Sequence, residues 1–439
     1  MTRKVWLIII LSLLMFLVLI LLLFSNRPIS PSTCTPDIPV TAGLLTSPPT
    51  DIVNVGELIP LGNLNPGGGH VLPVDHMYLS YPTPAGSGRN SYPVYNMADG
   101  QLFMLMRTQN PGRMDYQIFI KHSCSVYSYF DHLHSLSPDI ETYLTSNSVA
   151  WHDLSGSGSG PWMAFLGQSG EPAMMSLASG DQIGETRDYS HSWDVGLVDT
   201  RQTNGIFANV SASRYPGFSD FVPMFPELSY IDLSIYNLGN KRLNAACFID
   251  YMDNSVGMQT AWHARLASTP KGCGNVGWDT PGYLRGSWFN PALDSLPGVV
   301  MDNEVAAFSI IPDNFNPASR IQIGIGNAAN GTTVPNLALL DPVIWAPPVS
   351  APQVQRPLFA NIDTTAGTVV NPNPATVEPG VTVCYDLSYD GYYNTMLLHM
   401  TDSTHLKVKY DPTARTTAQC IALATGFPAV DSRWIEYVR

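Results

Sequence analysis

The residues best suited to chemistry gather in one short stretch, residues 67–82, which reads GGGHVLPVDHMYLSYP. Zinc takes histidine nitrogen and carboxylate oxygen as ligands in a tetrahedral shell, and a catalytic zinc site keeps one position for water. Four residues separate His70 from Asp75, and the glycines before them let the backbone turn sharply, so the pair can supply two ligands from one turn and strand. A third ligand has to come from another segment, and the candidates in the same region are His122, His132, His134 and His191.

The same stretch also has a purely structural interpretation. A histidine after three glycines can cap a turn, and an aspartate before a strand often bonds backbone amides. His76 follows Asp75 directly, and successive side chains of a strand point to opposite faces. We therefore expect His76 to lie on the surface, away from Asp75.

The segments that would position these residues are predicted to be short strands. The runs 76–82, 100–107 and 115–123 are apolar or aromatic, and Gly, Asn or Pro bound them. With 35 Gly, 36 Pro and only 13% charged residues, the composition favours a turn-rich β protein. One helix is predicted over 240–252, where apolar residues recur at helical spacing.

The N-terminus carries an apolar run, Val5–Phe24, of twenty residues without a charge. At about 1.5 Å per residue, this run spans a hydrocarbon core of roughly 30 Å. Arg3 and Lys4 precede it and no small-residue cleavage site follows. We predict an uncleaved, single-pass anchor with a cytoplasmic N-terminus and an extracytoplasmic remainder. A long signal peptide that is removed is the alternative.

Shifts in composition divide the chain into five predicted parts. They are a transmembrane anchor (1–27), a stalk rich in Pro, Ser and Thr (28–57), a first β domain (58–214), a middle region of one helix plus strands (215–348) and a smaller C-terminal β domain (349–439). The predicted fold class is therefore mainly β, with an N-terminal transmembrane helix.

Charge and cysteine content narrow the possible partners and cofactors. The net charge is −13 and no long basic run occurs, which argues against a nucleic-acid partner. The six cysteines form no C-x-x-C pair, so a thiolate zinc site is not expected. In an exported chain an even number suggests disulfides, and the pairs nearest in sequence are Cys247–Cys273 and Cys384–Cys420, which leaves Cys34–Cys124. Fifteen connectivities are open to six cysteines, and buried free thiols are a further alternative.

Four short signals occur in an order that resembles the lysostaphin-type zinc metalloendopeptidases, which have a β-rich duplicated hybrid motif fold. The segments are GHVLPVD, YPVYNMADGQLFML, YQIFIKHSCSVYSYFDHL and ASGDQIGETRDYSHSWDVGL, and they cover roughly residues 60–200. The resemblance implies that the first β domain is peptidase-like. It also implies metal ligands at His70, Asp75 and His191, with Asp194 as a substitute ligand. His132 matches the family's additional active-site histidine, which stabilises charge.

Two departures from the family pattern bear on activity. The family has three residues between the first His and Asp, whereas this chain has four, and its His-x-His pair is replaced here by His191 followed by Trp193 or Asp194. Because hydrolysis needs ligand and base together, we expect an incomplete active site without a cofactor.

The predicted function is therefore a non-catalytic scaffold or binding module at the envelope, with a cell-wall glycopeptide or an envelope protein as its partner. One alternative is an active zinc endopeptidase that cleaves cell-wall or other peptides. Another is a structural surface protein whose last eighty residues mediate assembly.

Overall fold

The computed structural model describes most of the chain beyond residue 34. The described residues are 35–37, 39, 43–64, 70–82, 90–110, 113–154, 161–188, 192–211, 214–217, 228–255, 257–291, 303–326, 358–363, 371–389, 392–411, 417–425, 427 and 434–439. Residues 36–439 form one compact unit, and the predicted anchor at Val5–Phe24 lies outside the described residues. Within those ranges, no helix has the length and apolar character needed to cross a membrane.

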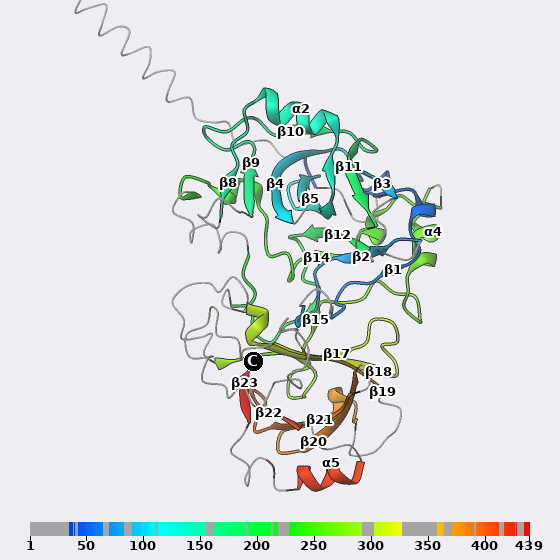
Figure 1. Ribbon diagram of the computed structural model, residues 1–439, viewed down its shortest axis with the longest axis vertical. Coiled ribbons are helices and arrows are strands. Elements are labelled where there is room, and N and C mark those ends of the chain that lie inside the picture. Colours follow the sequence, from blue (N-terminus) through cyan, green and yellow to red (C-terminus); the bar gives the residue numbers. More distant parts are fainter. Residues whose placement is uncertain are drawn as a thin grey trace, which may run out of the picture. The chain divides into compact units, whose positions relative to one another are not determined.

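The protein is mainly β, as predicted, and its first large sheet has ten antiparallel strands (Figure 1). The strand order is β1-β2-β12-β6-β5-β4-β9-β8, with β10 paired to β4 and β14 paired to β12. The bounds are β1 Leu58–Ile59, β2 Met77–Ser80, β4 Gly100–Asn110, β5 Arg113–Lys121, β6 Val126–Leu133, β8 His152–Asp153, β9 Trp162–Phe165, β10 Met175–Leu177, β12 Ser192–Asp199 and β14 Ala245–Ala246. The central strands β5, β6 and β12 are apolar and aromatic because both of their faces are covered.

Two hydrophobic clusters cover the faces of this sheet. On one face, Ile118, Phe130 and Val195 pack with helix α2 (Pro138–Ser146) and with a three-stranded sheet of β3 (Ser91–Tyr95), β11 (Gln182–Arg187) and β7 (Ser135–Leu136). Ser137 caps α2 by accepting a hydrogen bond from the Ile140 amide, and Pro138 begins the helix. On the other face, the aromatic rings of β4, β5 and β6 pack with residues 228–238, which include the 3-10 helix η5 (Leu233–Tyr236).

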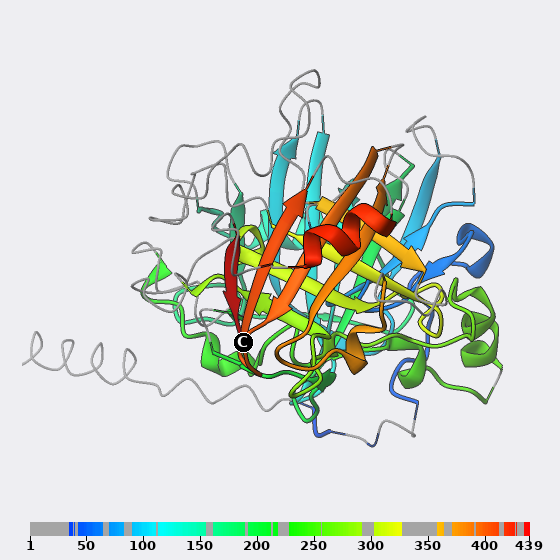
Figure 2. The same cartoon turned by 90° about the horizontal axis from the view of Figure 1, so that it is seen from below.

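The second large sheet has eight strands in the order β19-β18-β17-β16-β23-β22-β21-β20. The bounds are β16 Gly286–Phe289, β17 Ala307–Pro312, β18 Arg320–Ile325, β19 Leu358–Asp363, β20 Thr382–Tyr389, β21 Tyr392–Met400, β22 His405–Asp411 and β23 Ile435–Val438. Figure 2 shows helix α5 (Thr417–Ala424) lying across β20 and β21. A domain boundary is predicted at 348/349, whereas this sheet takes strands from both sides of that point. The reason is that β16 pairs with β17 on one edge and with β23, near the end of the chain, on the other.

The helix predicted over 240–252 is wrong. Ala245 and Ala246 form β14, which pairs with β12, and Phe248–Tyr251 is a single 3-10 turn, η6. The apolar residues from Ala245 to Ile249 are all buried, in consecutive positions, so their spacing does not mark one helical face. The helix of this region, α4, lies further on, at Met258–Arg265. The remaining described elements are η2 (Ile52–Asn54), η8 (Asn303–Ala306), η12 (Pro374–Thr376) and the parallel pair of β13 (Gly205–Ile206) and β15 (Gly277–Trp278).

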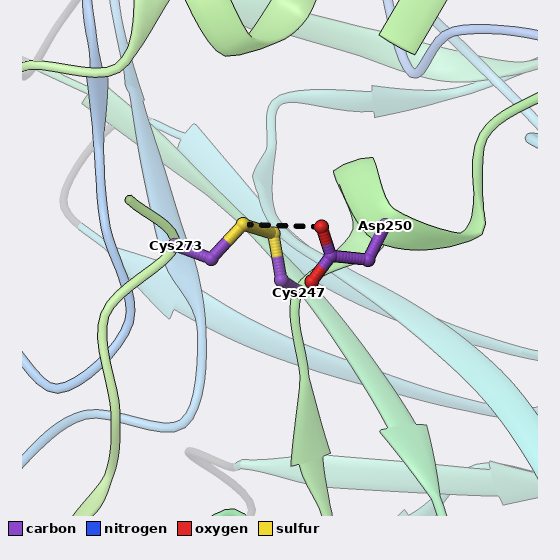
Figure 3. A group of neighbouring side chains, drawn as sticks. All are labelled: Cys247, Asp250 and Cys273. Atoms are coloured by element: carbon purple, nitrogen blue, oxygen red, sulfur yellow. Dashed lines mark hydrogen bonds between the residues drawn. A yellow bond between two sulfur atoms is a disulfide. The ribbon is translucent and has the colours of Figure 1, made fainter. Parts of the chain in front are cut away.

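Two of the predicted disulfides are confirmed. Cys247 and Cys273 are bonded with their Cα atoms 5.8 Å apart, and Cys384 in β20 is bonded to Cys420 in α5 with a Cα separation of 5.9 Å. Asp250 lies beside the first disulfide, with its Oδ1 3.8 Å from Cys273 Sγ (Figure 3). Both sulfurs are already used in the disulfide, so this group offers a metal no thiolate. Cys34 lies outside the described residues, and the pairing Cys34–Cys124 stays a prediction.

Candidate metal centre

Three neighbouring strands bring the candidate residues to one face of the first sheet. Asp194 on β12 lies opposite Tyr78 on β2 and opposite Asp131 on β6. Directly opposed residues share a face, and so do residues two apart along an extended chain. His76, two residues before Tyr78, therefore lies on the same face as Asp194, just ahead of β2. This register joins segments that are more than a hundred residues apart in the sequence.

Asp194 lies between two imidazoles. Its Oδ2 is 3.3 Å from His76 Nε2 and 3.4 Å from His132 Nε2. The two buried residues of this trio, Asp194 and His76, are only 5% and 8% exposed. Within the described part of the chain, neither Asp194 Oδ1 nor His76 Nε2 has a hydrogen-bond partner. A buried polar atom without a hydrogen bond is costly, so Asp194 Oδ1 is suited to a ligand that the chain itself does not supply, and His76 Nε2 adjoins it through Asp194 Oδ2.

A carboxylate holds the Nδ1 atom of each histidine in this region. His76 Nδ1 donates to Asp75 Oδ1 at 2.9 Å, and His132 Nδ1 donates to Asp115 Oδ2 at 3.1 Å. His70, whose ring centroid is 5.9 Å from that of His76, has its Nδ1 3.2 Å from an oxygen of Glu304. Histidines that bind metals commonly donate their second ring N–H to a carboxylate, which fixes the tautomer and orients the other nitrogen. The three carboxylates thus hold the Nδ1 atoms, while the Nε2 atoms of His76 and His132 both face Asp194.

Asp75 is held in place from the aromatic face of the sheet. The Tyr129 hydroxyl donates to Asp75 Oδ1 at 2.8 Å, and the Lys241 ammonium lies 3.7 Å from the centre of the Tyr129 ring. Burial raises the pKa of Asp75, but the positive charge of Lys241 and the hydrogen bond to His76 outweigh it and hold that pKa well below its usual value. Asp75 is therefore ionised and supports His76.

A β-bulge directs His132 toward Asp194. The register between β5 and β6 shifts between Tyr116 and Ile118, so that Asp131 and His132 together oppose Gln117. His132 has a φ of 64°, a left-handed conformation that side chains other than glycine rarely adopt. Asp131 stabilises it by accepting hydrogen bonds from the His132 amide and the Gln117 side chain, both at 2.8 Å. Bulges and strained residues of this kind recur at functional sites because they re-aim a side chain.

The electrostatics of the cluster favour a cation. Burial lowers the pKa of His132, but its hydrogen bonds to Asp115 and Asp194 outweigh burial and raise that pKa above its usual value. Burial raises the pKa of Asp194, but the charge of His76 and the hydrogen bond from His132 lower it overall. Burial, with the neighbouring Asp194 and Asp115 charges, raises the pKa of Asp131. Three carboxylates thus lie close to one imidazolium, and this excess of negative charge favours a cation.

The structure brings together most of the predicted site residues. Asp194 and His132 meet, and His70 is nearby, but Asp75 contacts His76 and not Asp194. His191 lies outside the described residues. The prediction that His76 lies on the surface is wrong, because both faces of the sheet are covered where it enters β2 and its ring packs against Tyr78 at 4.8 Å.

The other candidate histidines lie elsewhere. His122 is buried, with its Nε2 2.8 Å from the Ser128 hydroxyl. His134 lines a separate cavity of about 430 Å³ next to α2. Asp115, Asp131 and Glu304 are not among the site residues predicted from the sequence. Asp131 stands beside His132 in the segment YFDHL and could have been noted, whereas nothing in the sequence links Asp115 or Glu304 to the histidines.

Comparison with known proteins does not assign the chain to a family. The chain matches no protein-family model and none of the curated protein sequences.

Proposed function

We propose that the chain is a membrane-anchored, extracytoplasmic zinc-dependent hydrolase. In this proposal His70, His76 and Asp194 bind the metal and His132 assists the reaction. The observation that carries it is the position of Asp194 between two imidazoles whose other nitrogens are held by carboxylates. The donor set of imidazole nitrogen and carboxylate oxygen suits zinc, and Asp194 Oδ1 and His76 Nε2, which make no hydrogen bond, are the atoms that an ion would satisfy.

The residues of the chain have distinct parts in such a reaction. Bound zinc would supply a Lewis acid and a water of lowered pKa. Asp75 and Glu304 hold the ligating histidines by their Nδ1 atoms, so that each presents Nε2. His132 has a side chain that is 48% exposed, so a substrate can approach it from solvent. With Nδ1 bonded to Asp115, its Nε2 can hold or release a proton beside the metal. Peptides of the cell envelope are the proposed substrate class, because the sequence resembles lysostaphin-type peptidases and the predicted anchor would place the chain at the membrane.

A second candidate is the non-catalytic envelope module that binds cell-wall glycopeptide or a partner protein. The observation that favours it is the number of donors. His70, His76, His132 and Asp194 are together enough to fill a tetrahedral shell, and a closed shell is typical of structural zinc sites. In that arrangement no position remains for water, and the ion stabilises a binding surface.

Metal analysis of the full chain, purified in detergent, tests both candidates. We expect about one zinc per chain in the wild type and its loss in Asp194→Asn. The matched control is Asp402→Asn, because Asp402 pairs with His405 at 2.9 Å in an exposed turn of the second sheet. Absence of zinc from the wild type would contradict both candidates.

An activity assay then separates the two candidates. Glycine-rich and peptidoglycan-stem peptides are incubated with the zinc-loaded protein. Hydrolysis that Asp194→Asn abolishes and Asp402→Asn leaves intact supports the hydrolase. Bound zinc without hydrolysis, together with specific retention of wall material, supports the binding module.

A further inference from the structure

One carboxylate of the second sheet's segment reaches the candidate metal centre. Glu304 lies on η8, directly before β17, and is 234 residues away from His70 in the sequence. Its Oε1 lies 3.2 Å from His70 Nδ1 and accepts a hydrogen bond from Arg242 at 2.7 Å. Its Oε2 accepts hydrogen bonds from the backbone amides of Val71 and Leu72, at 2.5 and 2.9 Å. Both oxygens are thus used to hold three consecutive residues and one buried cation.

The environment of Glu304 makes these contacts stable. Its side chain is only 14% exposed, and the Arg242 side chain is 16% exposed. Charge-assisted hydrogen bonds are shorter and stronger than neutral ones. They become stronger still where water is excluded, because the local dielectric constant is low. The apolar side chains of Val71 and Leu72 pack in one cluster with Ala306, which adjoins β17. Polar and apolar contacts therefore fix the same short segment.

Further contacts hold the chain just before this segment. Gln322 on β18 accepts a hydrogen bond from the Leu64 amide at 2.9 Å and donates to Asn63 at 3.1 Å. Asn314, between β17 and β18, donates to the carbonyl oxygens of Pro60 and Leu61. The second sheet thus binds the stretch that leads to His70 at several points, although that stretch belongs to the first sheet's part of the sequence.

We propose that Glu304 is a positioning residue of the metal centre, and that the second sheet therefore contributes to the site by holding Glu304 in place. The proposal rests on the proposed function. His70 lies outside the paired strands of the first sheet and seven residues before β2, whereas His76 directly precedes β2 and Asp194 lies within β12, so the backbone of His70 lacks this support. Glu304 supplies this restraint by fixing the ring through Nδ1 and the backbone through Val71 and Leu72. A metal site whose supporting hydrogen bonds are removed typically loses 10- to 100-fold in affinity.

The test is Glu304→Gln in the full chain, with zinc affinity measured by competition against a chromophoric chelator. Glutamine keeps the size and one acceptor oxygen but lacks the charge that aligns His70 and pairs with Arg242. We expect a loss of about 10- to 100-fold in affinity. Glu378→Gln is the matched control, because Glu378 is exposed in the same part of the chain before β20, and it should keep the wild-type affinity. Glu304→Asp, which keeps the charge, should recover part of the loss.

Two readouts separate positioning from general stability. The visible spectrum of the cobalt-substituted protein reports ligand geometry, and we expect it to change in Glu304→Gln and not in Glu378→Gln. In the double variant with His70→Gln, loss of Glu304 should add nothing, because Glu304 acts through His70. Should Glu304→Gln not fold, the cobalt spectrum and affinity of Glu304→Asp serve instead, with both expected to differ from the wild type.

Several results would overturn the inference. Unchanged affinity in Glu304→Gln, while the wild type binds zinc, would refute it and leave the proposed function standing. Additive losses in the double variant would show that Glu304 does not act through His70. A wild type that binds no zinc would remove the proposed function and this inference together.

Discussion

Gly196→Ala should disturb the support of His76 through Tyr129. Gly196 on β12 lies directly opposite Tyr129 on β6, and the tyrosine ring lies over the glycine. A Cβ atom at Gly196 would be 2.0 Å from Tyr129 Cζ and 2.5 Å from its hydroxyl oxygen. Carbon atoms normally stay about 3.5–4.0 Å apart, so the ring must move by about 1.5–2 Å. That movement removes the hydroxyl from Asp75, whose other contact is with His76.

The expected loss of stability follows from these contacts. Overpacking a well-filled core costs about 1–3 kcal/mol. The lost hydrogen bond has an ionised acceptor and contributes about 1.5–3 kcal/mol. Together they predict that Gly196→Ala lowers the free energy of unfolding by about 2.5–6 kcal/mol. Tyr129→Phe keeps the ring and removes only the hydroxyl, so it should lose about 1.5–3 kcal/mol.

Urea unfolding of the full chain, followed by far-UV circular dichroism, measures these changes. The decisive variant combines Gly196→Ala with Tyr129→Ala. Without a ring at position 129 the new methyl group meets no obstacle, so the double variant should be no less stable than Tyr129→Ala alone. Additive losses would refute the steric argument, and so would wild-type stability of Gly196→Ala.

Two further predictions concern pH and the disulfides. Burial lowers the pKa of His122 to about 4, against a value near 6.5 in an unfolded chain, so folding favours its neutral form. Stability should therefore fall by up to about 3 kcal/mol as the pH drops from about 6.5 to 4, and His122→Gln should lack this part of the decline when urea midpoints of the two proteins are compared. Equal pH dependence of the two proteins would contradict the assignment. Replacing both cysteines of Cys384–Cys420, which closes a separation of 36 residues, by serine should lower the free energy of unfolding by about 4 kcal/mol. The shorter separation of 26 residues in Cys247–Cys273 predicts a slightly smaller loss, about 3.5 kcal/mol, and unchanged urea midpoints would contradict the cross-link argument.

The sequence by itself determined the β class, and it suggested the two disulfide pairs that the structure confirms. Alternating apolar and aromatic runs, frequent turn residues and low charge are local properties, and each can be seen within a few residues. The two confirmed pairs are those closest in sequence, and short loops close at a low entropic cost. Residue types and spacing also singled out His70, Asp75 and His132 as candidates, and the family resemblance added Asp194.

Only the tertiary structure decided how those residues relate. Strand alternation assigns a side chain to a face only when the strand's limits and pairing are known, and for this reason His76 was predicted to be exposed although it is buried. The bulge at His132 adds one residue on one strand and so turns its ring toward Asp194, which no local pattern reveals. Glu304 reaches His70 across 234 residues, and β16 pairs with strands from both sides of a predicted boundary. These contacts depend on hydrogen bonds and packing between distant segments, whose positions are set by the folded chain as a whole.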